Sequence, residues 1–205
     1  MLGFFTLNLR AIAAESPTKV VKILAFGDSI TAGYKLPSTV AYPFQLEKIL
    51  KAKNYNAQVI NAGISGDTSL QGLQRVDWVM KHHPKVDIVL LELGANDGLR
   101  GLSIPSMEEN LTKLIEKFKN LGVKEIVLFG MKTTRNFAPE YQKQFEGAFP
   151  KIAKRQGIRY LPFFLERIAF HPDMTLEDLI HPNELGHQQL ANEIFRFLEK
   201  SATLN

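Results

Sequence analysis

Short, mainly apolar runs alternate along this chain with longer segments of helical pattern. The runs do not alternate between apolar and polar at every second residue, and they are Val20–Phe26, Gln58–Asn61, Val86–Leu93, Glu125–Met131 and Arg159–Phe163. Continuous apolar runs are typical of strands buried on both faces of a parallel sheet. The alternation therefore predicts an α/β fold, a single three-layer α/β/α domain around a five-stranded parallel sheet.

The intervening segments carry the signals of helices. They are Pro43–Lys53, Ser69–Met80, a segment around Met107–Phe118, Pro139–Gln156 and Glu184–Lys200. In the third segment Ser106 and Glu109 form a candidate capping box at the start, and Gly122 predicts a left-handed end. Pro150 predicts a kink or a break in the fourth helix, because proline lacks the N–H group that a helix interior needs.

Length and composition predict one globular domain over residues 20–205. A chain of 205 residues buries enough surface for a stable core. No apolar stretch approaches the ~18–20 residues that span a bilayer, so we expect no stable membrane insertion. The net charge of +4 comes from lysines spread over the predicted helices, which argues against a nucleic-acid partner. The absence of cysteine excludes disulfides and thiol catalysis.

Residues 1–19 form a separate N-terminal segment, for which we expect a signal peptide or its remnant. Met1–Leu7 is largely apolar, and Ala11–Ala13 resembles a cleavage site with small residues. Arg10 interrupts the apolar part, and no basic residue precedes it, so a cytosolic tail is the alternative. The segment predicts a periplasmic or secreted protein, with a cytoplasmic location as the alternative.

Four short motifs stand in order along the chain. They are GDSI at 27–30, GISGD at 63–67, GAND at 94–97 and DLIHP at 178–182. The first three directly follow apolar runs, and ligands of parallel sheets bind where the carboxyl ends of the strands meet. We therefore expect Ser29, Gly66 and Asn96 to converge at one edge of the sheet. Asp178 and His181 follow the fifth run, in a loop that can return to the same edge.

The residue types in these motifs suit acyl transfer. A serine hydroxyl such as that of Ser29 becomes a nucleophile when a base takes its proton. The His181 imidazole can accept a proton near neutral pH, and Asp178, three residues earlier, can fix its tautomer. We therefore interpret Ser29, His181 and Asp178 as a catalytic triad. The alternatives are a helix-capping serine and a surface histidine.

The same motifs contain donors for an oxyanion hole. The backbone N–H groups of Ser29 and Gly66 and the side-chain amide of Asn96 can stabilise the negative charge of a tetrahedral intermediate. In the alternative, Gly66 and Asn96 serve only as turn residues. We expect no metal, because His187, six residues after His181, lacks a third convergent ligand.

Substrate contacts are predicted on both sides of the site. Leu99 and Arg100 follow the GAND motif and form a candidate lip. The segment from Thr133 to Phe149 supplies Thr134, Phe137 and Tyr141 as candidate walls of an acyl groove. Aromatic residues at a spacing of four also fit a buried helical stripe, which is the alternative. A small domain favours a shallow groove and acyl chains of short to medium length.

The motifs resemble those of the SGNH, or GDSL-type, hydrolases, and in more detail the bacterial thioesterase I, lysophospholipase L1 and arylesterase branch. The stretches that carry the resemblance are GDSITAGY, NAGISGDTSLQGL, LELGANDGLRG, LPFF and DLIHPN, and it extends from Ile23 to the end of the chain. Ile30 stands where the eponymous motif has leucine. The GxSxG elbow of ordinary α/β-hydrolases is absent, because Thr31 stands at its second glycine.

The resemblance implies a flavodoxin-like domain with strand order 2-1-3-4-5. It also implies a Ser-His-Asp triad that works without metal or cofactor. The implied substrates are small-molecule aryl or acyl esters, acyl thioesters and lysophospholipids. Two other functions stay open, a carbohydrate O-deacetylase of the same superfamily and a non-catalytic binding module. The sequence makes no prediction of oligomeric state.

Overall fold

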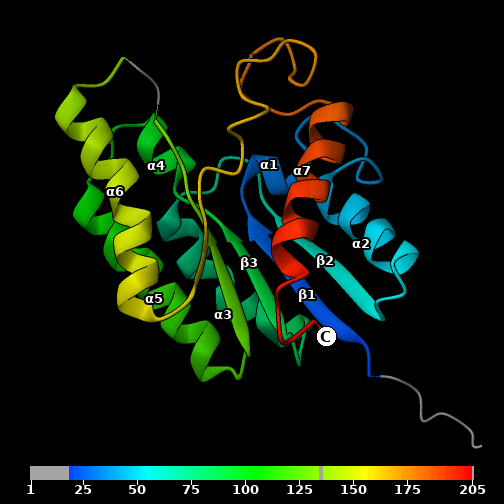
Figure 1. Cartoon of the computed structure of the whole chain (residues 1–205). Coiled ribbons are helices and arrows are strands. Elements are labelled where there is room, and N and C mark those ends of the chain that lie inside the picture. The colour runs from blue at the N-terminus through cyan, green and yellow to red at the C-terminus, as the bar shows by residue number, and fades with distance from the viewer. Residues whose placement is uncertain (1–18, 134–135, 205) are drawn as a thin grey trace, which may run out of the picture.

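The fold is built around a five-stranded parallel sheet. Figure 1 shows the computed structural model of the chain, which describes residues 19–133 and 136–204. The strands are β1 (Val21–Gly27), β2 (Ala57–Gly63), β3 (Ile88–Glu92), β4 (Glu125–Phe129) and β5 (Arg159–Leu161). They are parallel and lie in the order β2-β1-β3-β4-β5. The predicted α/β fold class and strand order are confirmed.

Helices cover both faces of this sheet (Figure 1). One face carries α2 (Tyr42–Ala52) and α7 (Glu184–Leu198), which pack against each other. The other face carries α3 (Ser69–His82), α5 (Ile104–Asn120) and α6 (Pro139–Gln156). Two short helices, α1 (Ser29–Ala32) and α4 (Ala95–Leu99), begin just after β1 and β3. The three layers are those that a parallel sheet with crossover helices requires.

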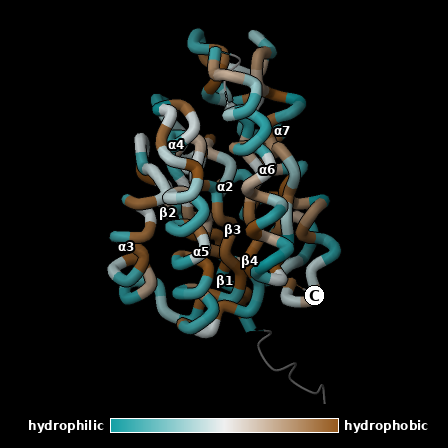
Figure 2. Tube along the Cα trace, turned by 90° about the vertical axis from the view of Figure 1, so that its left-hand side faces the viewer, coloured by the Kyte–Doolittle hydropathy of each residue, from teal (hydrophilic) through white to brown (hydrophobic). Residues whose placement is uncertain are grey.

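The core consists of the strands and the helix faces turned toward them. Every residue of β3 is buried, and so are the last five of β1, which explains why these runs are apolar without alternation. Figure 2 shows the strands as a brown interior between helices with mixed surfaces. Burying one large aliphatic side chain of this kind contributes ~1.5–3 kcal/mol. The rigid sheet that results is the platform for the site.

The strand register brings the functional edge into line. Gly27, the last residue of β1, is level with Gly63 at the end of β2 and with Glu92 at the end of β3. The segments that leave these three ends therefore start side by side. Ser29 and Asn96 lie in two of those segments, on α1 and α4.

Two local expectations differ from the structure. Helix α6 is not broken at Pro150, because buried Phe145, Phe149 and Ile152 anchor the helix on both sides of the proline and offset its cost of ~3 kcal/mol. Helix α5 begins at Ile104 with Ser103 as its N-cap, so Ser106 and Glu109 do not form the capping box. The left-handed end at Gly122 is confirmed by its φ of 83°.

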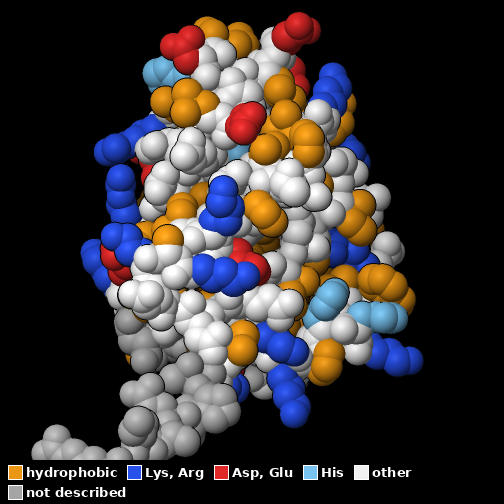
Figure 3. All heavy atoms as spheres, turned by 90° about the vertical axis from the view of Figure 1, so that its right-hand side faces the viewer, with side chains coloured by type: hydrophobic (Ala, Val, Ile, Leu, Met, Phe, Trp, Pro, Cys, Tyr) orange, Lys and Arg blue, Asp and Glu red, His pale blue; other side chains and the backbone are white. Residues whose placement is uncertain are grey.

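On the face drawn in Figure 3, the basic side chains do not form one continuous patch. Figure 3 shows lysine and arginine side chains scattered over the side that carries α2 and α7 rather than gathered into one stripe. In the part of the chain that the structure describes, no helix is long and apolar enough to cross a bilayer. The signal-peptide prediction depends on residues 1–18, which lie outside the described residues.

Candidate active site

The nucleophile candidate Ser29 is held by a tight strand-to-helix turn. Asp28 caps α1, and its Oδ1 accepts the Ile30 N–H at 3.1 Å. Gly27 precedes this cap, and a Cβ atom there would lie 2.1 Å from Thr31 Oγ1. Only glycine therefore allows the strand to approach the helix so closely. The turn leaves the Ser29 side chain at the carboxyl edge of the sheet.

Ser29, His181 and Asp178 form a continuous hydrogen-bonded chain, as the motifs predict. Ser29 Oγ lies 2.9 Å from His181 Nε2, across 152 positions of sequence. His181 Nδ1 lies 2.8 Å from Asp178 Oδ2. The ring of Tyr34, from the segment after α1, packs against the His181 ring with centroids 4.6 Å apart. These contacts define both the position and the orientation of the imidazole.

The turn around Asp178 explains why a spacing of three places acid and imidazole together. Asp178 Oδ1 accepts the N–H groups of Ile180 and His181, both at 2.9 Å. Leu179 lies between them with a φ of 58°, a conformation that non-glycine residues seldom adopt. Burial raises the Asp178 pKa, but the two backbone donors and the His181 ring hold it below its usual range. Asp178 is therefore a charged partner for His181.

The loop that returns Asp178 and His181 to the sheet is held by its own contacts. Leu176 donates its N–H to the His181 carbonyl at 2.8 Å, and Thr175 bridges to Pro182. The Asn183 side chain donates to the Thr175 carbonyl and also caps α7. Helix α7 thereby anchors the loop on the body of the domain.

The oxyanion candidates converge beside Ser29. Gly66 has a φ of 88°, which favours glycine. Within residues 19–133 and 136–204, neither the Gly66 N–H nor the Ser29 N–H has a hydrogen-bond acceptor. Asn96 Nδ2 donates to Asp28 Oδ2 at 3.1 Å and to the Asp67 carbonyl at 3.0 Å. The amide thus reaches the predicted place, but both of its protons already have acceptors.

Two arginine side chains support the loop around Gly66, and the sequence motifs do not mark the first of them, Arg75. Arg75 on α3 pairs with Asp67 at 2.6 Å and donates to the Gly27 carbonyl at 3.0 Å. Arg100 donates to the Gly66 carbonyl at 2.9 Å. No sequence motif contains Arg75, because it lies within helix α3, eight positions beyond Asp67. Arg100, a predicted substrate contact, orients this backbone peptide and is not among the residues that line the cavity described below.

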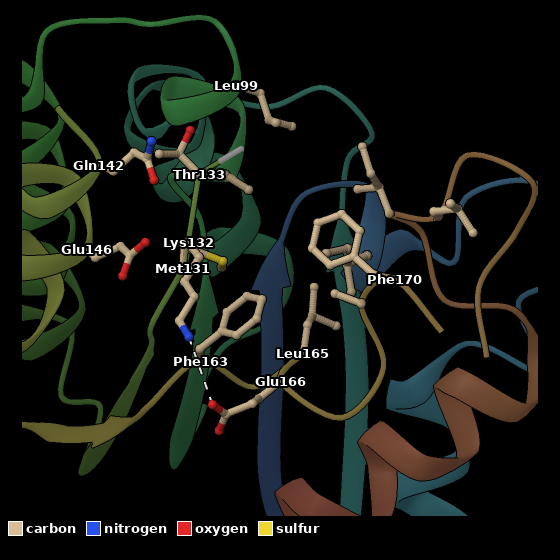
Figure 4. Close-up of a pocket in the computed structure, with 15 residues that line it drawn as sticks. Leu99, Met131, Lys132, Thr133, Gln142, Glu146, Phe163, Leu165, Glu166 and Phe170 are labelled. Carbon is tan, nitrogen blue, oxygen red and sulfur yellow. Dashed lines mark ion pairs between the residues drawn. The ribbon is translucent and has the colours of Figure 1, made fainter. Parts of the chain in front are cut away.

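A cavity of about 420 Å³ opens beside the triad. Ile30, Ala95 and Ile180, each next to a candidate catalytic or oxyanion residue, lie in its wall. Other apolar walls come from Leu99, Met131, Phe163, Leu165, Phe170 and Leu179. Figure 4 shows Lys132, Thr133, Gln142 and Glu146 together on the side across from Phe170. The cavity is therefore apolar near the serine and polar on its far side.

Two further predicted substrate contacts, Phe137 and Tyr141, lie outside this cavity. The Tyr141 hydroxyl donates to the Leu102 carbonyl at 2.9 Å, and the Phe137 ring packs over Gly101. Phe145 follows Phe137 and Tyr141 at the same spacing of four residues. It is fully buried, as the alternative of a buried helical stripe predicts. Thr134 lies outside the described residues. Phe137 and Tyr141 thus support the segment after α4 rather than the cavity wall.

The surroundings of His187 indicate a role in packing rather than in binding a metal ion. Its ring is buried, and Nδ1 accepts the Tyr42 N–H at 3.2 Å at the start of α2. Burial lowers the pKa of His187 to about 4, so the ring is neutral at pH 7. Among the described residues, no three or more His, Asp or Glu side chains converge on a point that would hold a metal ion.

The fold and this arrangement define the class of protein, a serine hydrolase with a three-layer α/β/α core. Residues 25–189 match the GDSL-like Lipase/Acylhydrolase family. The chain belongs to that family, and it is a carboxylic ester hydrolase. The resemblance in the four motifs is confirmed.

Similar proteins carry consistent names. The chain is 34% identical over 197 residues to an arylesterase of Vibrio mimicus, covering 96% of this chain and 94% of that protein. It is 37% identical over 193 residues to thioesterase 1/protease 1/lysophospholipase L1 of Escherichia coli K12, covering 94% and 88%. The crystal structure of the psychrotrophic esterase EstA from Pseudoalteromonas sp. matches with a TM-score of 0.83 at 32% identity, covering 87% and 97%.

Proposed function

We propose that Ser29, His181 and Asp178 hydrolyse esters through a covalent acyl-enzyme. The observation that carries the proposal is the pair of contacts at 2.9 and 2.8 Å that joins the three side chains. His181 Nε2 takes the Ser29 proton as Oγ attacks the carbonyl carbon, and Asp178 stabilises the imidazolium. The alcohol or thiol leaves with that proton. Water then attacks the acyl group with His181 as base, and the acid is released.

The oxyanion is stabilised by the N–H groups of Ser29 and Gly66 and by Asn96. The two backbone donors have no acceptor among the residues that the structure describes, so they are available to a developing negative charge. The Asn96 amide shares a proton with the oxyanion by loosening its 3.1 Å contact with Asp28 or its 3.0 Å contact with Asp67. One such donor contributes about 10²–10³-fold to turnover.

The cavity supports short to medium acyl chains as the preferred substrates. Each methylene buried against its apolar wall contributes ~0.8 kcal/mol. A volume of about 420 Å³ is at the small end for ligand pockets. A longer chain reaches Lys132 and Glu146, which must then lose contact with water. The names of the similar proteins extend the candidate substrates to aryl esters, acyl thioesters and lysophospholipids.

The experiment is a p-nitrophenyl ester series from acetyl to palmitoyl, run beside palmitoyl-CoA and a lysophospholipid with wild type and Ser29→Ala. We expect an optimum at short to medium chains. We expect the variant to lose about 10³-fold or more in turnover at an unchanged Tm. A serine-reactive phosphonate should label Ser29 in the wild type alone.

The other outcomes distinguish the alternatives. Wild-type activity in Ser29→Ala would refute the assignment of the nucleophile. Turnover of an acetylated sugar far above that of every nitrophenyl ester would favour the O-deacetylase. Failure of the phosphonate to label any serine would favour a binding module. The periplasmic or secreted location is a separate proposal that depends on residues 1–18, and fractionation of cells that express the full chain tests it.

A further inference from the structure

Two carboxyl groups are buried together beneath the nucleophile turn. Asp28 follows β1 directly, and Glu92 is the last residue of β3, level with Gly27. Glu92 is 0% exposed and Asp28 1% exposed. The proposed mechanism uses neither of them, and Glu92 ends an apolar run in which nothing marks it as functional.

Glu92 contacts the residues on both sides of Ser29. Its Oε2 accepts the Asp28 N–H at 3.1 Å, the Thr31 N–H at 3.3 Å and the Thr31 hydroxyl at 2.8 Å. A Cβ atom on Gly27 would lie 2.5 Å from the same oxygen. One carboxyl oxygen therefore ties the end of the strand to the first turn of α1, with Ser29 between the two tied residues.

Asp28 extends this connection to the nucleophile Ser29 and to the oxyanion donor Asn96. Its Oδ1 accepts the Ile30 N–H and lies 3.4 Å from Ser29 Oγ. Its Oδ2 accepts one proton of the Asn96 amide at 3.1 Å. The charge on Asp28 therefore decides how firmly the oxyanion donor Asn96 is held.

The surroundings oppose two negative charges in this space. Burial raises the pKa of Glu92 well above its usual range, and the neighbouring charge of Asp28 raises it further. Burial also raises the pKa of Asp28. The titratable groups that face the pair are Tyr42 from α2 and His181 from the C-terminal loop, while Arg75 from α3 binds the Gly27 carbonyl. No lysine or arginine in the described part of the chain forms an ion pair with either carboxyl.

The second oxygen of Glu92 bears on whether this side chain is charged. Glu92 Oε1 is buried and has no hydrogen-bond partner within the described residues. A charged carboxylate oxygen without a donor is far more costly to bury than an uncharged carboxyl oxygen. Both the shared space and this oxygen favour a Glu92 that keeps its proton while Asp28 carries the negative charge and accepts the hydrogen bond that this proton offers.

We propose that Glu92 is a positioning residue, which holds the nucleophile turn from below as a neutral hydrogen-bond acceptor and leaves the single negative charge of the pair on Asp28, beside Asn96. This inference rests on the proposed roles of Ser29 and Asn96. Glu92 acts on the reaction only through the residues it holds.

The first experiment compares Glu92→Gln with Glu92→Asp. Glutamine keeps a neutral oxygen acceptor at the same reach, so we expect kcat within about threefold of wild type. Aspartate withdraws the acceptor by one methylene from Asp28 and Thr31, so we expect kcat to fall at least about thirtyfold with KM within twofold. Loss of kcat in Glu92→Gln as large as in Glu92→Asp would overturn the proposal, because it would require a charged Glu92.

The matched control is Asp87→Asn. Asp87 is a buried carboxylate just before the other end of β3, paired with Lys19 and Lys124. Its loss should lower the Tm and leave kcat unchanged. An equal fall of kcat in Asp87→Asn and Glu92→Asp would overturn the positioning role, because any change to a buried carboxyl group beside β3 would then do the same.

The second experiment is the Tm of wild type and Glu92→Gln from pH 5 to pH 9. An unfolded glutamate ionises near pH 4.5, whereas burial raises the pKa of folded Glu92 well above that value, so the wild type loses stability as pH rises from the unfolded pKa toward the folded pKa. Glutamine does not titrate. We expect the Tm of the variant relative to wild type to rise with pH over that interval.

A constant Tm difference between pH 5 and pH 9 would overturn the neutral Glu92. This readout needs no activity, so its failure differs from a failure of the proposed function, which unlabelled Ser29 would reveal. If Glu92→Asp does not fold, the kcat and Tm profile of Glu92→Gln decide the matter.

Discussion

Arg100 donates a hydrogen bond from Nη2 to the carbonyl oxygen of Gly66, with the two atoms 2.9 Å apart. Gly66 needs its left-handed φ of 88° to turn its peptides at the edge of the sheet. A side chain from the segment after α4 thus fixes the loop after β2 at its oxyanion candidate. The contact joins two motifs that sequence reasoning treated as independent.

This contact leads to a prediction for Arg100→Ala. Without the guanidinium, the Gly66 peptide samples other orientations, and a displaced oxyanion donor costs turnover rather than binding. We expect kcat to fall roughly tenfold while KM and Tm change little. Arg100→Lys, which keeps one donor, should recover part of the loss. A rise of KM at constant kcat would instead indicate that Arg100 binds the substrate directly.

The second prediction concerns Asp178→Asn. The asparagine oxygen can still accept the two backbone N–H groups, but its amide then donates to His181 Nδ1 and leaves the proton on Nε2. That tautomer cannot accept the Ser29 proton, so kcat should fall about 10³–10⁴-fold. Steady-state kinetics on a short nitrophenyl ester measure this. Asp173→Asn, an exposed change in the same loop, should be neutral, and an equal loss there would point to a folding defect.

The third prediction is a shift in chain-length preference. Lys132 is an exposed charge on the far side of the cavity, and its 3.9 Å ion pair with Glu166 contributes little to stability. Lys132→Met replaces a charge by an apolar side chain, so each added methylene of the acyl chain should contribute more binding free energy. We expect the optimum of the nitrophenyl series to move to longer chains. Lys143→Met, on the outer side of α6, is the control and should leave the optimum unchanged.

The fourth prediction concerns acid stability and His187. Its pKa is lowered from 6.5 to about 4 by burial, so the unfolded chain binds a proton that the folded chain excludes between these pH values. Stability is complete above pH 6.5 and falls as pH decreases toward 4, by about 3 kcal/mol from this residue. Urea unfolding of wild type and His187→Asn at several pH values tests this. The variant should be less stable at pH 7 and less sensitive to acid, and parallel profiles would contradict the assignment.

Much of the fold follows from the pattern of apolar residues. The five strands lie within the predicted runs or extend them by a few residues, as at β2, where Gln58–Asn61 becomes Ala57–Gly63. Helix ends were less predictable. At α5 the choice between Ser103 and Ser106 as cap depended on Pro105, which fits the first turn of a helix. At α6 the packing of Phe145 and Phe149 outweighed Pro150.

The residues of the site likewise divide into those that the sequence motifs predict and those that they do not. Ser29, Gly66, Asn96, Asp178 and His181 were predictable because each stands in a short motif beside an apolar run or a turn. Arg75 and Glu92 were not, because their partners Gly27, Asp28 and Thr31 belong to elements 48 to 64 positions away. The contact between Glu92 and the Asp28 N–H spans 64 positions, and no local pattern records it. Phe137 and Tyr141 were chemically plausible contacts, but they pack on the segment after α4 instead.

Local sequence accounts for the succession of strands and helices, the turns that expose each functional group and the pairing of Asp178 with His181, since all of these depend on neighbours within a few residues. Tertiary packing accounts for the contact of Ser29 with His181, the hold of Arg100 on Gly66 and the place of Glu92 beneath the nucleophile. These contacts depend on strand register and on the return of the 171–183 loop, which are set by packing of the whole core.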